Sequence, residues 1–397
     1  MQRKIKEQFL YIGALIARYM KVKQPLWHFS ACFCFFWWGG LAGAFGQGNV
    51  DFSGVVTKYD STFSGIGPEV YFLPPPKTEA ELLDDRYAEK EVDSALVEEY
   101  VKRMQYYHRL EMTGNGDVAV KYVPIRESQA SSIEGKLLLA ADYNIARNNL
   151  NALADIHNRL AMEYVALGTV DYAVEFFEKA IQAKRNVNNM ADWETITQNL
   201  AVAYEYLGQL DKAYELRQQL YERAVKNRNN RDQANTLLEL ALIKAKKGGW
   251  SEAERDIIRK AVPLFRRIRD EAGRASAYST LAAIYTLQHK YPEAQWFLVQ
   301  AKTIVDREGI REQLPEIIFH LAETKKFAGN PSVAIEEYKM ASDLARKDHR
   351  IGMQLAIQDA LGNLYHEAGD YDGAALALNQ YDMLKNMLFK GVAPVDN

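Results

Sequence analysis

The chain has 397 residues, 48% of them hydrophobic and 25% charged, as expected of folded domains or one long repeat array. Its formal net charge of −3 is unevenly distributed, because residues 1–46 carry six basic side chains and one acidic side chain. The remaining residues carry 43 basic and 51 acidic side chains. An acidic body is a poor match for phosphate, so we expect no nucleic-acid partner. Both cysteines, Cys32 and Cys34, lie before residue 47, which leaves no thiol elsewhere for a disulfide, a metal site or a nucleophile.

Residues 1–46 have the features of an export signal. Residues 29–46 form a stretch of eighteen residues without a charge, preceded by the basic residues Lys21 and Lys23. The stretch ends in small residues that suit cleavage before Gln47. This pattern predicts a signal peptide and an exported protein, in the periplasm or cell envelope of a Gram-negative bacterium.

Two alternatives to a cleaved signal stay open. Residues 29–46 are at the lower length limit of a membrane span, so an uncleaved anchor would associate the protein with a membrane. Lipidation at Cys32 is a weaker alternative, because this cysteine lies near the start of the apolar stretch. The segment before Met20 makes the charged region unusually long, so we expect Met20 to be the true start of the signal.

The next two segments show no repeat. Residues 47–78 contain scattered glycines and three consecutive prolines, which predict an extended or flexible linker. Residues 79–150 have helical periodicity, broken by the turn sequence at residues 113–117. We interpret residues 79–150 as an atypical helical N-terminal cap, because a repeat array must cover the apolar edge of its first copy.

Six near-copies of one helical hairpin fill residues 151–390, and residues 391–397 form a tail. Each copy has a leucine followed by a small residue, and an alanine thirteen positions after the leucine. The leucines are Leu160, Leu200, Leu240, Leu281, Leu321 and Leu361, and the alanines are Ala173, Ala213, Ala253, Ala294, Ala334 and Ala374. A turn glycine lies between them in five of the six copies, and His289 takes its place in the fourth. A fixed period with fixed internal spacings predicts a stacked array of helix pairs.

The copies resemble the tetratricopeptide repeat, in a longer form of about forty residues, over about 60% of the chain. The first copy carries the resemblance most clearly, with Leu160, Ala161, Tyr164, Gly168, Ala173, Phe177 and Ala180 at the family's spacings. The resemblance implies an all-α fold, a right-handed α-solenoid of stacked antiparallel helix pairs. It also implies that the first helices of the pairs line a concave groove. Arg217 and Lys244 stand where the family usually has an aromatic residue, which predicts a less apolar interior in copies two and three.

No catalytic constellation is recognisable. The sequence has no Gly-rich phosphate loop and no His-Glu-x-x-His motif, and its seven histidines are scattered. Glu316, His320 and Glu323 can share a helix face, which we interpret as a solvated polar face rather than a metal site. We therefore expect no enzyme activity, no metal and no cofactor.

Basic residues concentrate in the third copy. They are Lys244, Lys246, Lys247, Arg255, Arg259, Lys260, Arg266, Arg267 and Arg269. The cluster fits an acidic partner or an anionic surface, or simply a solvated helix face balanced by neighbouring acidic residues. We favour the solvated face.

The resemblance, carried across by position, predicts groove residues for a protein or peptide partner. They are Asn158, Arg159, Gln198, Asn199, Tyr206, Asn235, Phe319, His320 and Asn363. Asn and Gln amides can pair with both the donor and the acceptor of an extended peptide backbone, and apolar neighbours can hold its side chains. The Lys/Asn/Arg set with which the family grips a C-terminal carboxylate is not reproduced.

The leading hypothesis is a non-catalytic exported scaffold or adaptor that holds a protein or peptide in the groove. The alternative is a sensor or regulatory module that relays ligand occupancy to a membrane partner. If the groove residues serve only the partner, Asn199→Asp with Tyr206→Ala should weaken its capture and leave the melting temperature nearly unchanged.

Overall fold

The computed structural model describes residues 55–57, 70–72, 77–113 and 132–389. The chain divides into two compact units, residues 1–76 and residues 77–397. In the first, strands β1 (Val55–Thr57) and β2 (Val70–Phe72) pair antiparallel, within the segment predicted as a linker. The predicted signal or anchor at residues 1–46 and the tail at residues 391–397 lie outside the described residues.

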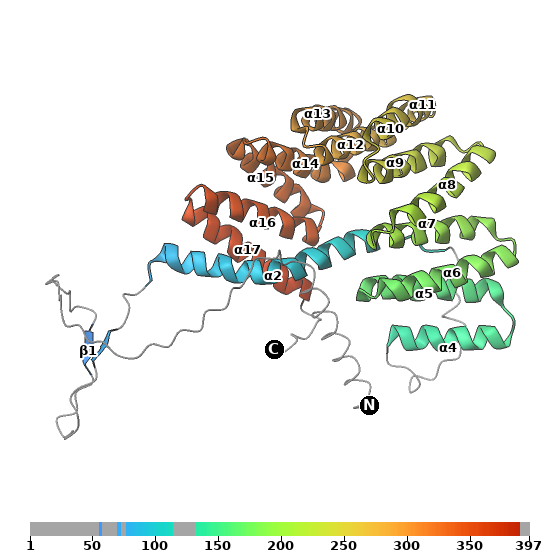
Figure 1. Ribbon diagram of the computed structural model, residues 1–397, viewed down its shortest axis with the longest axis horizontal. Coiled ribbons are helices and arrows are strands. Elements are labelled where there is room, and N and C mark those ends of the chain that lie inside the picture. Colours follow the sequence, from blue (N-terminus) through green and yellow to red (C-terminus); the bar gives the residue numbers. More distant parts are fainter. Residues whose placement is uncertain (1–54, 58–69, 73–76, 114–131, 390–397) are drawn as a thin grey trace, which may run out of the picture. The chain divides into compact units, whose positions relative to one another are not determined.

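The second unit is an array of antiparallel helix pairs in which each helix packs on the next along the chain (Figure 1). Pairs one to three are α5 (Leu150–Leu167) with α6 (Val170–Asn186), α7 (Met190–Tyr206) with α8 (Leu210–Lys226), and α9 (Asn230–Lys246) with α10 (Trp250–Asp256), η2 (Ile257–Ala261) and α11 (Val262–Arg267). Pairs four to six are α12 (Glu271–Leu287) with α13 (Tyr291–Glu308), α14 (Leu314–Phe327) with α15 (Pro331–Lys347), and α16 (Ile351–Glu367) with α17 (Tyr371–Phe389). A short η3 (Arg311–Gln313) precedes α14. This architecture confirms the predicted all-α class of stacked helix pairs.

Small residues bring the two helices of each pair together. Ala161 of α5 and Ala173 of α6 have no exposed surface, and the corresponding alanines of the later pairs are equally buried. A large side chain at such a crossing would force the helices apart. The leucine-alanine pattern of the sequence is therefore a packing pattern.

Each turn inside a pair contains one residue with a left-handed backbone. These residues are Gly168, Gly208, Gly248, His289, Gly329 and Gly369, with φ between 58° and 88°. Glycine reaches this region without steric cost, and a residue with a Cβ atom does not. His289 adopts the left-handed conformation at φ 58°, so the fourth turn keeps the shape of the others without their glycine.

Arg217 and Lys244, the charged residues at the usual aromatic positions of pairs two and three, form ion pairs, with Arg217 fully buried and Lys244 partly buried. Lys244 of α9 binds Asp256 of α10 through its ammonium group at 2.6 Å. Tyr204 of α7, at the equivalent position of pair two, instead donates to Glu178 of α6 at 2.8 Å. The side chain at this position thus contacts a carboxylate in both pairs. Lys244 contacts one of its own pair, and Tyr204 contacts one of the preceding pair.

In its described residues, the segment predicted as one helical cap contains α2 and α4, which lie in different places. α4 (Ile133–Ala146) packs on α5 at the start of the array. α2 (Glu79–His108) is one long helix of 30 residues, and Thr78 and Glu81 form the capping box at its start. α2 packs against α17 at one end of the array and against α5 and α7 at the other (Figure 1).

Candidate partner-binding groove

The candidate site is the surface formed by the first helices of the pairs, which we call the groove. The predicted groove residues lie on α5, α7, α9, α14 and α16. Residues 79–113, which we call the docked segment, contact this surface near both ends of the array. The middle of the groove, formed by α9, α12 and α14, holds an open cavity.

After α2 ends, the chain leaves the helical conformation and binds the groove through its backbone. Asn199 Oδ1 accepts a hydrogen bond from the Glu111 amide at 2.8 Å, and Asn199 Nδ2 donates to the Glu111 carbonyl at 2.8 Å. The same Nδ2 also donates to Asn158 Oδ1 at 3.1 Å. Both asparagines are buried. This is the amide-to-backbone pairing expected of a groove amide, and here its ligand is the chain itself.

The side chains around Glu111 occupy separate places on pairs one and two. Leu110 is buried in the apolar core that these pairs share. Met112 lies with its sulfur 3.3 Å from a guanidinium nitrogen of Arg159. Thr113 is buried close to Asp155, whose pKa is raised by burial, against the lowering effect of Lys184 and Thr113. The five residues Arg109–Thr113 therefore lie on the groove like a bound peptide.

Arg109 completes a group of two arginines and two glutamates, of which Arg217 and Glu205 are buried. Arg217 of α8 is 1% exposed and binds Glu205 at 3.2 Å and Glu239 at 2.5 Å. Arg109 binds the same two carboxylates, Glu205 at 3.1 Å and Glu239 at 3.9 Å. Without Arg109, two carboxylates would share one cation in a partly dehydrated place. Sequence reasoning missed Glu205, although an arginine at an aromatic position signals that it needs acidic partners.

The start of the docked segment binds the last pair. Lys90, with 5% of its side chain exposed, donates to Asp359 at 2.6 Å and to Asn363 at 2.8 Å. Tyr87 donates its hydroxyl hydrogen to the Ala374 carbonyl at 3.0 Å. The predicted groove residue Asn363 thus receives a lysine of the same chain.

Tyr206 contacts the second half of α2. Its hydroxyl donates to Glu99, its ring meets that of Tyr106 edge to face at 5.3 Å, and the Lys102 ammonium lies 5.3 Å from the ring centre. Burial, and then the hydrogen bond to Glu99, raises the pKa of Tyr206. Tyr206 therefore donates this hydrogen bond throughout the neutral pH range.

The remaining predicted residues line cavities. Gln198 and Asn235 line one of about 340 Å³ together with Glu111. Phe319 lines one of about 300 Å³ between α2 and the last two pairs. These cavities show that the docked segment leaves part of the groove unfilled.

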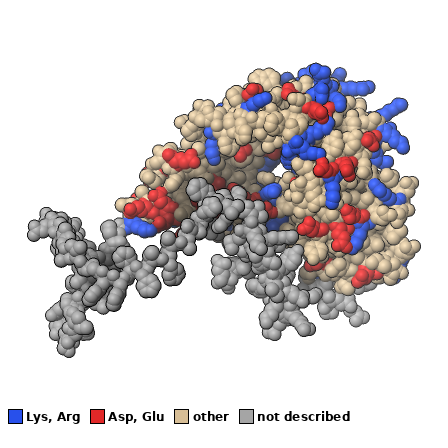
Figure 2. Space-filling view, viewed as in Figure 1, with Lys and Arg blue, Asp and Glu red and all other residues tan. Residues whose placement is uncertain are grey.

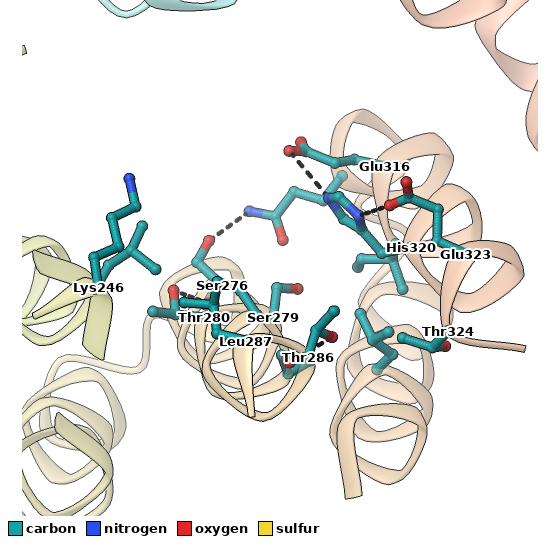
Figure 3. Close-up of a pocket in the computed structure, with 16 residues that line it drawn as sticks. Lys246, Ser276, Ser279, Thr280, Thr286, Leu287, Glu316, His320, Glu323 and Thr324 are labelled. Atoms are coloured by element: carbon teal, nitrogen blue, oxygen red, sulfur yellow. Dashed lines mark hydrogen bonds and ion pairs between the residues drawn. The ribbon is translucent and has the colours of Figure 1, made fainter. Parts of the chain in front are cut away.

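A third cavity, of about 530 Å³, opens between α9, α12 and α14 (Figure 3). Ser276, Ser279 and Thr280 of α12 face it, with Lys246 on one side and His320 on the other. His320 lies between two carboxylates, with Nδ1 2.9 Å from Glu323 and Nε2 4.0 Å from Glu316. Burial lowers the pKa of His320, but Glu323 and Glu316 outweigh it and raise the pKa above its usual value. This hydroxyl-rich cavity can hold polar groups of a ligand.

The basic cluster of pair three extends over both of its helices, with Lys244 and Lys246 on α9 and five further residues on α10, η2 and α11. Figure 2 shows Lys and Arg side chains gathered at the upper right, where Figure 1 places α10 and α11. Asp256 partly balances them, binding Lys244 at 2.6 Å and Lys260 at 2.7 Å. Lys260, with 56% of its side chain exposed, fits the solvated face, whereas Lys244 is partly buried, with 23% exposed.

Within the described ranges, no three His, Cys, Asp or Glu side chains are grouped as metal ligands would be. The same ranges contain no helix that is both long and apolar enough for a membrane span. The apolar stretch at residues 29–46 lies outside them.

Comparison with known proteins supports a tetratricopeptide repeat in the first pair. A family model described as "Tetratricopeptide repeat" matches residues 154–187, which cover most of α5 and α6. No curated protein matches the chain.

Solved structures with helical repeats resemble the chain to a limited degree. The apo form of RapI is 13% identical, with a TM-score of 0.47 over 72% of this chain and 100% of that one. TPR-like repeats of a kinesin light chain attributed to Podospora anserina are 22% identical, with a TM-score of 0.40 over 49% and 95%. A thermophilic TPR protein of Thermus thermophilus is 24% identical, with a TM-score of 0.39 over 52% and 98%. None of these values is high enough to carry an argument about function.

Proposed function

We propose that the protein is a non-catalytic binding scaffold that holds a protein or peptide partner in its groove. The observation that carries this proposal is the pair of hydrogen bonds between the Asn199 amide and the backbone of Glu111. They recognise an extended polypeptide without regard to its side chains, as a peptide-binding surface must. The open cavity between α9, α12 and α14 supplies further room for a ligand.

The proposal is tested by photo-crosslinking in the native host. A photoreactive amino acid replaces Ser279, which lines the groove cavity, or the exposed Val299 on helix α13 as a control outside that cavity. We expect one protein to be cross-linked from Ser279 and not from Val299. Equal labelling from both positions, or none from the groove, would reject the scaffold.

A second candidate function is a regulatory module that relays partner binding to a membrane protein. It is favoured by one observation, namely that α2 contacts α17 near one end of the array and α5 and α7 near the other. A partner that displaces α2 would release this connection and change the separation of the ends. Fluorescent labels on α4 and α17 would report it, and an unchanged distance at partner saturation would reject the relay.

We further propose that residues 1–46 export the protein, with Met20 as the start of the signal and cleavage before Gln47. The uncharged stretch at residues 29–46 and the basic residues before it support the proposal. Residues 47–397 carry 43 basic and 51 acidic side chains, a poor match for phosphate, so we propose no nucleic-acid partner. N-terminal sequencing of the protein from fractionated cells tests it. A mature chain that starts before Lys21 and is recovered with the membrane would replace the cleaved signal with an anchor.

A further inference from the structure

We infer that pairs one to three form a subsite for an extended peptide with a basic residue, an aliphatic residue, a third residue for which lysine is preferred to glutamate, a Met-like apolar residue and a threonine in this order. Arg109–Thr113 occupies this subsite in cis and is displaced by the partner segment. This inference rests on the proposed function and names the partner that the function leaves open.

The subsite contacts both the backbone and the side chains of its occupant. The Asn199 amide fixes the third residue by its N–H and C=O groups, so the occupant must be extended there. Glu205 and Glu239 then receive a cation from the first residue, and the shared core of pairs one and two receives the aliphatic second residue. Backbone contacts supply affinity in such sites, and the side-chain places supply specificity.

The third residue shows that the cis occupant is not the best ligand. Glu111 lines a cavity of about 340 Å³ whose wall also carries the carboxylates of Glu194, Asp232 and Glu239. Burial raises the pKa of Glu239, Arg217 and Arg109 lower it, and the carboxylates of Glu205 and Glu111 raise it further. The cavity wall also carries Arg217, but Glu111 and Glu239 repel one another, and a lysine in place of Glu111 would be attracted to Glu239.

The remainder of the docked segment is held by both polar and apolar contacts. Among the described side chains of α2, the buried hydrophobic ones are Leu83, Tyr87 and Val97, whereas Leu96 is 73% exposed. A helix of 30 residues normally buries a full apolar stripe when it belongs to a core. Its release therefore gives up these three buried side chains rather than a full apolar stripe, and partly exposed ion pairs such as Arg86 with Asp382 weaken in salt.

The test uses a fluorescent peptide with the sequence of residues 107–113 and blocked ends, added to the full-length protein. The native chain is compared with the variant Arg109→Ser plus Leu110→Ser, whose cis occupant is weakened. A tethered ligand competes at a high effective concentration, so we expect the peptide to bind the variant at least about tenfold more tightly. Equal binding to both chains would overturn the inference.

Modified peptides test the subsite without changing the protein. Methylation of the amide nitrogen of the glutamate removes the hydrogen that Asn199 accepts, and we expect binding to be lost. Replacing that glutamate by lysine should tighten binding by about tenfold, because the lysine faces the acidic cavity. Undiminished binding of the N-methylated peptide would overturn the inference. So would weaker binding of the lysine peptide.

Two controls keep the outcomes separable. Circular dichroism must show that the double variant keeps its helices, and Arg109→Gln alone replaces it if it does not. Partner capture from Ser279 without binding of the peptide would leave the scaffold in place and reject this subsite. Peptide binding without any captured partner would support the subsite and count against the scaffold.

Discussion

Gly362 of α16 is small because Tyr87 of α2 lies against it. A Cβ atom built on Gly362 would come within 2.6 Å of the Tyr87 hydroxyl oxygen, closer than packed atoms allow. The corresponding residue of the other pairs is alanine, as at Ala161 and Ala201. In the last pair, the residue after the repeated leucine is thus a glycine, and Tyr87 of the docked segment packs against this position.

We expect Gly362→Ala to loosen the start of α2 while leaving the array folded. The new methyl group displaces Tyr87, which breaks its hydrogen bond to the Ala374 carbonyl. Hydrogen exchange at residues 79–90 should become faster. Gly352→Ala in the same helix is the matched control, because nothing lies within 4 Å of a Cβ atom there. It should raise stability by about 0.5–1 kcal/mol through helix propensity alone. Equal hydrogen exchange in the two variants would contradict the packing of Tyr87 against Gly362.

Removing the charge of Arg217 should be strongly destabilising. Arg217→Met leaves Glu205 and Glu239 with Arg109 as their cation, and breaking a buried ion pair by removing one partner costs about 3–5 kcal/mol. Arg346→Met is the control, because the side chains of Arg346 and its partner Asp343 are both well exposed, and it should cost less than about 1 kcal/mol. Urea unfolding measures both. Similar losses would mean that the buried group is not coupled as its distances indicate.

The turn at His289 should be improved by glycine. At φ 58° its Cβ atom crowds the backbone, and the left-handed conformation costs an ordinary residue about 1–2 kcal/mol. Part of this gain is lost to the greater freedom of glycine in the unfolded chain. We therefore expect His289→Gly to stabilise pair four by about 1 kcal/mol and Gly208→Ala, at φ 72°, to destabilise pair two by a similar amount. Local hydrogen exchange would report the stability of each pair separately. Destabilisation by His289→Gly, or stabilisation by Gly208→Ala, would contradict this prediction.

The array could be predicted from sequence because its packing is local and repeated. Ala161, Ala173 and the turn glycines recur at fixed spacings, and each one reports a contact between helices that are neighbours in the chain. The position of α2 is not encoded in this way. Its contacts join residues far apart in the sequence, such as Lys90 with Asp359, and charged residues give no periodic signal. The groove could be located from its first helices, but its occupant could not.

One expectation from the sequence changes, because Asn199 contacts a segment that is far away in the chain. The sequence predicts that Asn199 and Tyr206 serve only a partner, so that Asn199→Asp with Tyr206→Ala would leave the melting temperature nearly unchanged. In the structure Asn199 is fully buried and bonded to Glu111 and Asn158. An aspartate would face the Glu111 carbonyl and the Asn158 Oδ1 with an acceptor instead of a donor. We expect instead a loss of about 1–3 kcal/mol, measurable by thermal unfolding. Gln198→Glu, on the neighbouring cavity wall, should change stability far less.

Acid should destabilise pair one through His157. Burial, aided by the charge of Lys179, lowers the pKa of His157 to about 4, from about 6.5 in the unfolded chain. The unfolded chain therefore binds the proton first as pH falls. The stability that neutral His157 contributes is complete above pH about 6.5 and is lost as pH falls towards about 4.

His157→Phe should flatten the fall in stability between these two pH values, because phenylalanine keeps the ring contact with Phe176, 5.6 Å between ring centres, and does not titrate. His320 is the control of opposite sign, because the carboxylates of Glu323 and Glu316 raise its pKa. Its stabilising contribution is present at low pH and is lost as pH rises above its unfolded value, so His320→Gln should weaken the protein at the acidic end of the range. Urea unfolding at pH steps across the range would show both effects, and an unchanged slope in His157→Phe would mean that this histidine is already protonated in the folded chain.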